Sequence, residues 1–178
     1  MSTATHTPEE SYGKLVAPRT IEIQRLLPGP IERIWDYLTK SDLRMQWLAF
    51  GDMPHEKGAA FKLTWPLAKF PGERPEGIPE EHSLDSQIVA WDPPRKLAFT
   101  WSDGSIVSFE LAPAGKRVLL KMVHKDLTTR SKMVGVSTGW HAHLDRLVAV
   151  VSGEDGGVFW DQWKAHKVDY EKRIPTDI

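Results

Sequence analysis

Alternating hydrophobicity followed by one long helical segment is the feature that most restricts the fold of this chain. Apolar side chains recur at every second position in four segments in the middle of the chain, and this period is typical of strands with one buried face. Short turns rich in Pro, Gly and Asp separate the segments, so an antiparallel meander is expected. The four expected strands are residues 83–90, 97–101, 107–111 and 118–124.

Two further strands and two short helices are expected before this meander. Residues 20–27 and 61–65 alternate in the same way. Between them, Pro30 suits the first position of a helix, and apolar residues follow it at steps of three and four. Ser41 is suited to cap a second short helix that ends near Trp47.

The last third of the chain is expected to be helical. Residues 131–152 contain no Pro, and their large apolar side chains recur at steps of three and four. This pattern predicts a helix about 30 Å long. Gly153 suits its end, and a further helix is expected over residues 158–173.

These elements predict an α+β fold. A curved antiparallel sheet of about six to seven strands wraps around the long helix, because that helix is large enough to cover the apolar face of the sheet. The space between them is a common place for ligands. We divide the chain into a flexible N-terminal tail (1–18), one domain (19–152) and a C-terminal helical extension (153–178). Residues 66–79 hold four Pro and two Gly, and so long a loop is either a functional lid or disordered.

Composition narrows the function classes. The net charge is −1 and the pI is near 6.7, which does not fit a nucleic-acid-binding protein. The absence of Cys excludes disulfides, thiolate metal sites and cysteine nucleophiles. No segment approaches the roughly 20 apolar residues of a membrane span, and no secretory signal is recognisable. We therefore expect a cytoplasmic protein that binds neither membranes nor nucleic acid.

Several motifs together resemble one protein superfamily. They are Arg25-x-x-x-Gly29-Pro30-x-x-x-Ile34-Trp35, Trp91-Asp92-Pro93-Pro94-Arg95-Lys96-Leu97-Ala98-Phe99-Thr100-Trp101 and Gly139-Trp140-x-x-x-Leu144-Asp145-Arg146-Leu147. Their order and spacing resemble the START-like (SRPBCC) proteins, in particular the bacterial relatives of the activator of Hsp90 ATPase. The resemblance spans roughly residues 19–152. It implies a helix-grip fold with an internal, mostly apolar cavity, but no single activity.

Five of the eight Trp of this chain are candidates for the wall of that cavity. An indole ring is a large apolar body with one N–H donor, which suits both a packed core and a binding cavity, and the sequence leaves both open. The inward-facing cavity candidates are Trp35, Trp47, Phe61, Trp65, Phe99, Trp101, Phe109, Met122, His124, Trp140, His143 and Leu144.

Arg25 is expected on the inward face of the first strand. A buried guanidinium must be paired. The partner is either a carboxylate such as Asp85 or Glu110, or an anionic group of a ligand. In the second case Arg25 is the polar anchor of the cavity.

The histidines do not predict a metal site. His141 and His143 lie two positions apart, so on a helix they point about 200° from each other and cannot bind one ion from that helix. His124 is expected to face inward, either as a cavity base or as a histidine satisfied by its neighbours. No motif for catalysis or for a cofactor is present, so no catalytic residue, metal or cofactor is assigned.

Three functions remain open. The first is binding of a hydrophobic or aromatic small molecule. The second is an enzyme of the polyketide cyclase or aromatase type, in which His124 or Arg25 acts as acid or base. The third is an Hsp90 co-chaperone-like or stress-response interaction protein, which the lack of the long N-terminal domain of the eukaryotic co-chaperone argues against. The aromatic segment 158–163 packs either on its own domain or in a homodimer.

Overall fold

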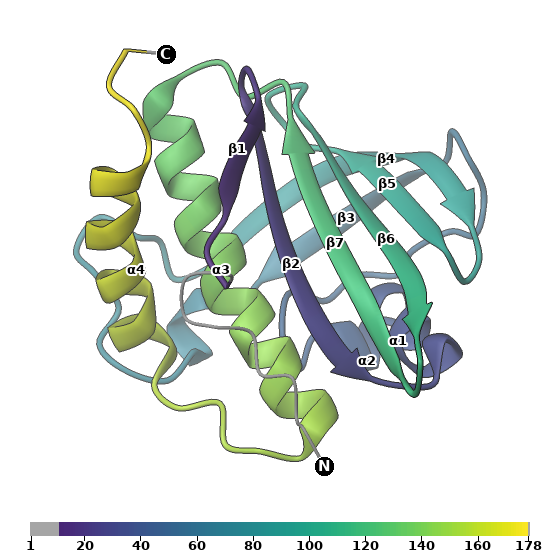
Figure 1. Cartoon of the computed structure of the whole chain (residues 1–178). Helices are drawn as coiled ribbons and strands as arrows, with labels where there is room; N and C mark the ends of the chain where they lie inside the picture. The colour runs from purple at the N-terminus through teal and green to yellow at the C-terminus, as the bar shows by residue number, and fades with distance from the viewer. Residues whose placement is uncertain (1–10, 178) are drawn as a thin grey trace.

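One antiparallel sheet of seven strands forms the body of the molecule (Figure 1). The computed structural model describes residues 11–177, and every structural statement below concerns those residues. The order of the strands across the sheet is β1-β2-β7-β6-β5-β4-β3. The strands are β1 (Lys14–Ala17), β2 (Thr20–Pro28), β3 (Ala60–Trp65), β4 (His82–Asp92), β5 (Lys96–Thr100), β6 (Ile106–Ala114) and β7 (Arg117–Lys125).

The alternation of the sequence gives the sheet one buried face. Along β2 and β7, every second side chain is buried, and those between are partly covered or, at Lys125, exposed. In the β2–β7 pairing, Ile21 lies opposite His124 and Ile23 opposite Met122, and all four are buried. A shift of one residue in this register would turn the buried set to solvent, so the apolar pattern specifies the pairing.

The buried face of the sheet is covered by a long helix. The helices are α1 (Ile31–Thr39), α2 (Ser41–Arg44), α3 (Arg130–Ser152) and α4 (Phe159–Arg173), with a short 3₁₀ helix, η1 (Leu67–Lys69). Figure 1 shows α4, α3 and the sheet side by side in that order. The hydroxyl of Thr129 accepts a hydrogen bond from Lys132 N at the start of α3, and Gly153 ends the helix in the left-handed conformation.

The helix-grip fold expected from the sequence is confirmed, with two differences in its elements. Strand β1 was not predicted, and it lies within the segment expected to be a flexible tail. All four of its residues are exposed, so it lacks the alternation by which strands are recognised. Helix α2 begins at Ser41, which therefore does not cap it as expected, and ends at Arg44, before the expected end near Trp47.

The Pro-rich loop packs against the C-terminal helix. The ring of Phe70 lies 4.8 Å from that of Phe159 and 6.1 Å from that of Trp160. Phe159 and Trp160 are both buried. Part of the aromatic segment 158–163 therefore packs on its own domain, and whether it also contacts a second copy stays a prediction.

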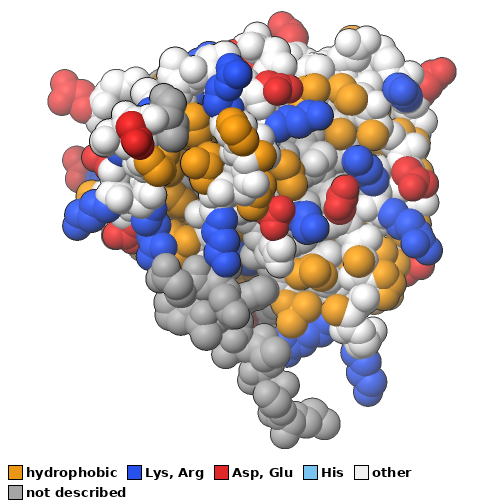
Figure 2. Space-filling view, turned by 45° about the horizontal axis from the view of Figure 1, so that its top comes forward, with side chains coloured by type: hydrophobic (Ala, Val, Ile, Leu, Met, Phe, Trp, Pro, Cys, Tyr) orange, Lys and Arg blue, Asp and Glu red, His pale blue; other side chains and the backbone are white. Residues whose placement is uncertain are grey.

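The surface carries charges of both signs. On the face shown in Figure 2, Lys and Arg alternate with Asp and Glu between hydrophobic patches. Among the described residues, no helix is both long and apolar enough to cross a bilayer. On this face, the mixture of charges provides no broad basic field of the kind that binding of nucleic acid requires.

Candidate functional site

An apolar pocket of about 190 Å³ opens between the first half of α3 and the neighbouring end of the sheet. Trp65 is the last residue of β3, His82 is the first of β4, and Trp101 follows β5. Leu48 and Leu67 contribute from the segments after α2 and β3. The residues from α3 are Gly135, Val136, Gly139, Trp140 and His143.

Two glycines on α3 leave room for the pocket. Gly135 and Gly139 lie one turn apart, and a Cβ added at either would meet no heavy atom within 4 Å. Glycine inside a helix costs about 0.5–1 kcal/mol relative to alanine. These two positions therefore combine a cost in helix stability with open space beside the pocket.

Three indole rings form a continuous wall. The ring centre of Trp101 lies 5.7 Å from that of Trp65 and 5.6 Å from that of Trp140. Each pair is inclined rather than parallel, which is a favourable arrangement for aromatic rings. The imidazole of His82 lies 5.7 Å from the ring of Trp65 and extends this wall.

His143 gives the pocket a polar edge. Its Nδ1 lies 2.9 Å from the carbonyl oxygen of Trp47. Because a carbonyl only accepts, Nδ1 carries the hydrogen, and Nε2 of the neutral ring is left as an acceptor. Burial lowers the pKa of His143 to about 4, which favours the neutral ring at neutral pH.

A chain of hydrogen bonds lies behind the indole wall. Trp140 Nε1 donates to His124 Nδ1 over 3.1 Å, so the neutral His124 ring carries its hydrogen on Nε2. That nitrogen lies 2.8 Å from the hydroxyl of Ser105, and the hydroxyl donates to Asp103 over 2.5 Å. Asp103 pairs with Lys132 at 3.2 Å. This chain of hydrogen bonds fixes the orientation of the Trp140 ring.

This environment shifts two pKa values. Burial lowers the pKa of His124 to about 4, against a weaker opposing effect of Asp103. Burial alone would raise the pKa of Asp103, but hydrogen bonds from Ser105 and the charge of Lys132 outweigh it and lower the value to about 2. At neutral pH this chain of hydrogen bonds therefore extends from the neutral imidazole of His124 to the ionised carboxylate of Asp103.

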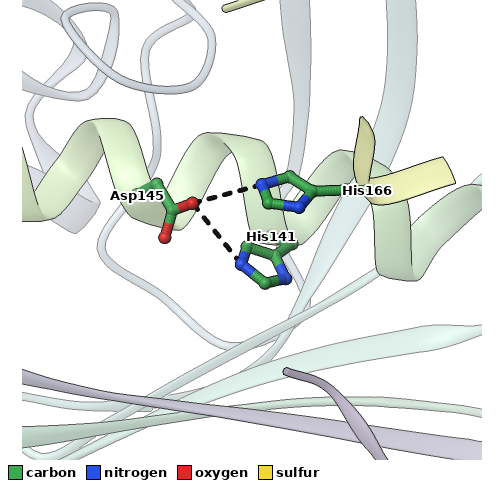
Figure 3. Close-up of side chains that lie close together, drawn as sticks. All are labelled: His141, Asp145 and His166. Carbon is green, nitrogen blue, oxygen red and sulfur yellow. Dashed lines mark hydrogen bonds and ion pairs between the residues drawn. The ribbon is translucent and has the colours of Figure 1, made fainter. Parts of the chain in front are cut away.

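Arg25 takes part in a different cluster, at the contact between α3 and α4. Its guanidinium is buried and pairs with Asp145 at 2.9 Å. It also donates to the carbonyl oxygens of Ser11 and Gln24. His141 and His166 both direct Nε2 toward the same carboxylate (Figure 3).

The partner of Arg25 is a carboxylate, as one of the two expected alternatives had it, but the two carboxylates named as examples are wrong. Asp85 is exposed and lies near Lys62, and Glu110 lies near Lys96. Both acidic residues are on the outer face of the sheet, since they alternate with the buried positions of their strands. Arg25 does not line the aromatic pocket; it lines a separate groove together with Asp145.

The structure divides the predicted cavity residues into two groups. Trp65, Trp101, Trp140 and His143 line the pocket. The others are buried in the surrounding core, and these are Trp35, Trp47, Phe61, Phe99, Phe109, Met122, His124 and Leu144. Among them, Trp47 donates its indole N–H to the carbonyl of Tyr37.

Six pocket residues were not among the candidates: Leu48, Leu67, His82, Gly135, Val136 and Gly139. The spacing of Gly135 and Gly139 was the available signal, because two glycines one turn apart leave a gap on one face of a helix. Leu48, Leu67 and His82 lie in or beside loops, where hydrophobic periodicity gives no orientation.

Comparison with known proteins places this architecture in a family. A family model described as activator of Hsp90 ATPase homolog 1-like protein matches residues 28–152. The comparison with curated proteins found no match.

Solved structures share the fold. A protein encoded by gene BPP1335 of Bordetella parapertussis is 35% identical, with a TM-score of 0.79 over 92% of this chain and 90% of that one. CalU16 of Micromonospora echinospora is 21% identical, with a TM-score of 0.65 over 87% of each chain. Protein BH1534 of Bacillus halodurans is 24% identical, with a TM-score of 0.59 over 74% of this chain and 96% of that one.

The last two similarities support the fold alone. The family model covers most of the chain, and the Bordetella protein aligns with nearly all of it. The chain therefore belongs to the activator of Hsp90 ATPase homolog 1-like family, within the START-like (SRPBCC) superfamily.

Proposed function

We propose that this protein binds a small aromatic molecule in the pocket between α3 and the sheet. The observation that carries this proposal is the wall of three indole rings facing a gap left by two helix glycines. Aromatic walls with few polar groups are typical of small-molecule sites. A cavity of about 150 Å³ in another protein holds benzene, so a volume of about 190 Å³ suits a ligand of one or two fused rings.

The polar edge of the pocket favours a ligand with a hydrogen-bond donor. Nε2 of His143 is an acceptor in the neutral ring, because Nδ1–H is used by the carbonyl of Trp47. A phenolic hydroxyl or a ring N–H would complement it. The ligand class that follows is a small phenol or nitrogen heterocycle with an otherwise apolar body.

Binding is favoured over catalysis by the placement of the candidate acid–base groups. Both nitrogens of His124 are engaged inside the protein, by Trp140 and Ser105. Arg25 is paired with Asp145 in another part of the molecule. A general acid or base must come within hydrogen-bond reach of the substrate, and neither of these two groups lines the pocket.

Titration with 2-naphthol, followed by tryptophan fluorescence and calorimetry, tests the proposal. The wild type is compared with the double variant Gly135→Ala/Gly139→Ala, which adds two methyl groups beside the open space. Ser131→Ala, at an exposed position of the same helix, is the matched control.

We expect saturable one-to-one binding by the wild type and by Ser131→Ala. The double variant should bind about tenfold more weakly, since overfilling a packed site costs about 1–3 kcal/mol. Equal affinity of all three proteins would place 2-naphthol elsewhere and contradict the proposal, as would the absence of binding to the wild type.

A further inference from the structure

The contact between α3 and α4 brings together two imidazoles and a carboxylate outside the aromatic pocket. We propose that His141, Asp145 and His166 form a binding site for a divalent cation with tetrahedral preference, with Zn²⁺ as the best match. His141 and Asp145 come from α3 and His166 comes from α4. The proposal does not depend on ligand binding in the pocket.

The spacing of the three ligand atoms suits a shared ion. His141 Nε2 lies 3.4 Å and His166 Nε2 lies 3.3 Å from the same oxygen, Oδ2 of Asp145. All three atoms lie within 4.8 Å of one another. Good hydrogen bonds are shorter, at about 2.7–3.2 Å. In a tetrahedral zinc site with bonds of about 2.0–2.1 Å, neighbouring ligand atoms lie about 3.3–3.4 Å apart.

Helix geometry and the packing of α4 on α3 bring the three ligand atoms close together. His141 and Asp145 are four residues apart on α3, so they share a face of the helix. Figure 3 shows both imidazoles directing a nitrogen toward the Asp145 carboxylate. The two rings are stacked with their centres 3.7 Å apart and their planes 23° from parallel, so binding of an ion requires the rings to rotate until both Nε2 lone pairs point at it. Two nitrogens and one carboxylate oxygen form a ligand set that zinc accepts, with water in the fourth position.

Neighbouring groups hold two of the ligands in place. Nδ1 of His141 lies 2.8 Å from the hydroxyl of Tyr170, which in turn accepts from the backbone N–H of Gly13. Arg25 occupies Oδ1 of Asp145 at 2.9 Å and leaves Oδ2 for the ion. Such outer contacts orient metal ligands and tune affinity.

The charge and exposure of the cluster determine how strongly it binds an ion and how the ion reaches it. The positive charge of Arg25 opposes a cation, so we expect weaker binding than in the structural sites of zinc fingers. The Asp145 side chain is 34% exposed, which gives the ion and a water molecule access. His141 is 3% and His166 14% exposed. An ion here would link α4 to α3 and stabilise their contact.

Calorimetric titration of the chelator-treated full chain with Zn²⁺ tests the proposal. The wild type is compared with His166→Ala and with His55→Ala, in which an exposed histidine away from the cluster is removed. We expect one ion per chain for the wild type and for His55→Ala, and affinity at least tenfold weaker for His166→Ala. Equal affinity of the two histidine variants, or no binding by the wild type up to about 1 mM Zn²⁺, would overturn the proposal.

His166 is the suitable position for this substitution. Its Nδ1 is buried without a hydrogen-bond partner among the described residues, so its removal deletes an unpaired polar atom, and His166→Ala is expected to fold. Circular dichroism checks the fold, and Zn²⁺ should raise the melting temperature of the wild type but not of the variant. If the variant does not fold, the visible spectrum of the Co²⁺-loaded wild type decides. Intense tetrahedral bands support the site, and a spectrum of hydrated Co²⁺ overturns it.

Discussion

Nε1 of Trp140 donates a hydrogen bond to Nδ1 of His124 over 3.1 Å, and this bond connects the wall of the pocket to the interior of the sheet. Trp140 lines the pocket, whereas His124 is fully buried on β7. The orientation of the pocket wall therefore depends on a polar chain that ends at the ion pair of Asp103 and Lys132.

Trp140→Phe should destabilise the fold through His124. The substitution keeps an aromatic ring but removes the N–H, which leaves Nδ1 of His124 buried without a donor. An unsatisfied buried polar atom costs about 1–3 kcal/mol. Urea unfolding at neutral pH measures this loss, with Trp163→Phe on α4 as the control expected to cost less. Equal losses in the two variants would show that the bond to His124 contributes little.

Stability should fall as the pH decreases from about 6.5 to about 4. The folded-state pKa of His124 is about 4, below the value of about 6.5 of an unfolded histidine. The native state therefore binds fewer protons than the unfolded state, and the stabilisation present above pH 6.5 is lost as the pH falls. The shift corresponds to about 3 kcal/mol of stability from this residue.

Unfolding free energies of the wild type and His124→Gln across this range isolate the contribution. Other buried histidines act in the same direction, so the wild-type curve reports their sum, and Gln removes the part due to His124. The groups that face the ring through hydrogen bonds are Trp140 and Ser105, with Asp103 and Lys132 beyond. If the dependence of the unfolding free energy on pH were unchanged by His124→Gln, this would contradict the burial of a neutral imidazole at His124.

Gly139→Ala should stabilise the protein. A Cβ at this position meets no atom within 4 Å, and alanine inside a helix is about 0.5–1 kcal/mol more favourable than glycine. Thermal unfolding should therefore show a higher melting temperature than that of the wild type. A lower one would mean that the space beside Gly139 is filled and that the pocket does not extend there.

Removal of the buried guanidinium should be costly, because it leaves Asp145 without its main partner. Arg25→Met is expected to lose about 3 kcal/mol of unfolding free energy, the low end of the range for breaking a buried ion pair, because Asp145 is partly exposed. Glu110→Gln, which removes an exposed pair with Lys96, should lose at most about 1 kcal/mol. The reverse ranking would contradict a stabilising role of the ion pair between Arg25 and Asp145.

The order of elements was predictable from the sequence, because burial on one face imposes a period of two on β2, β6 and β7. Helix α3 was predictable for the corresponding reason, since its apolar positions follow the helical period. Strand β1 was not, because its side chains are all exposed and its pairing with β2 uses backbone groups alone.

The site was predictable only in part. Inward orientation is shared by residues of a core and of a cavity, so Phe109 and Trp101 gave the same signal in the sequence. Gly135 and Gly139 line the pocket beside open space, and hydrophobic patterns do not register a missing side chain. The partner of Arg25 lies 120 residues away in the sequence, and its choice depends on the rotation of α3 relative to the sheet.

The same limit applies to the histidines. Helix geometry correctly separates His141 from His143: the former lies beside Tyr170 and the latter beside Trp47. It does not reveal that His166 of α4 stacks on His141, because the packing of two helices brings these residues together.

The most direct test of the aromatic pocket is nuclear magnetic resonance of the nitrogen-15-labelled protein with increasing 2-naphthol. The indole N–H signals of the eight Trp are assigned by single Trp→Phe substitutions. The pocket predicts that the signals of Trp65, Trp101 and Trp140 move together and saturate, while that of Trp163 on α4 stays in place. Signals that do not move, or larger changes at Trp163 than at the three wall residues, would contradict binding in this pocket.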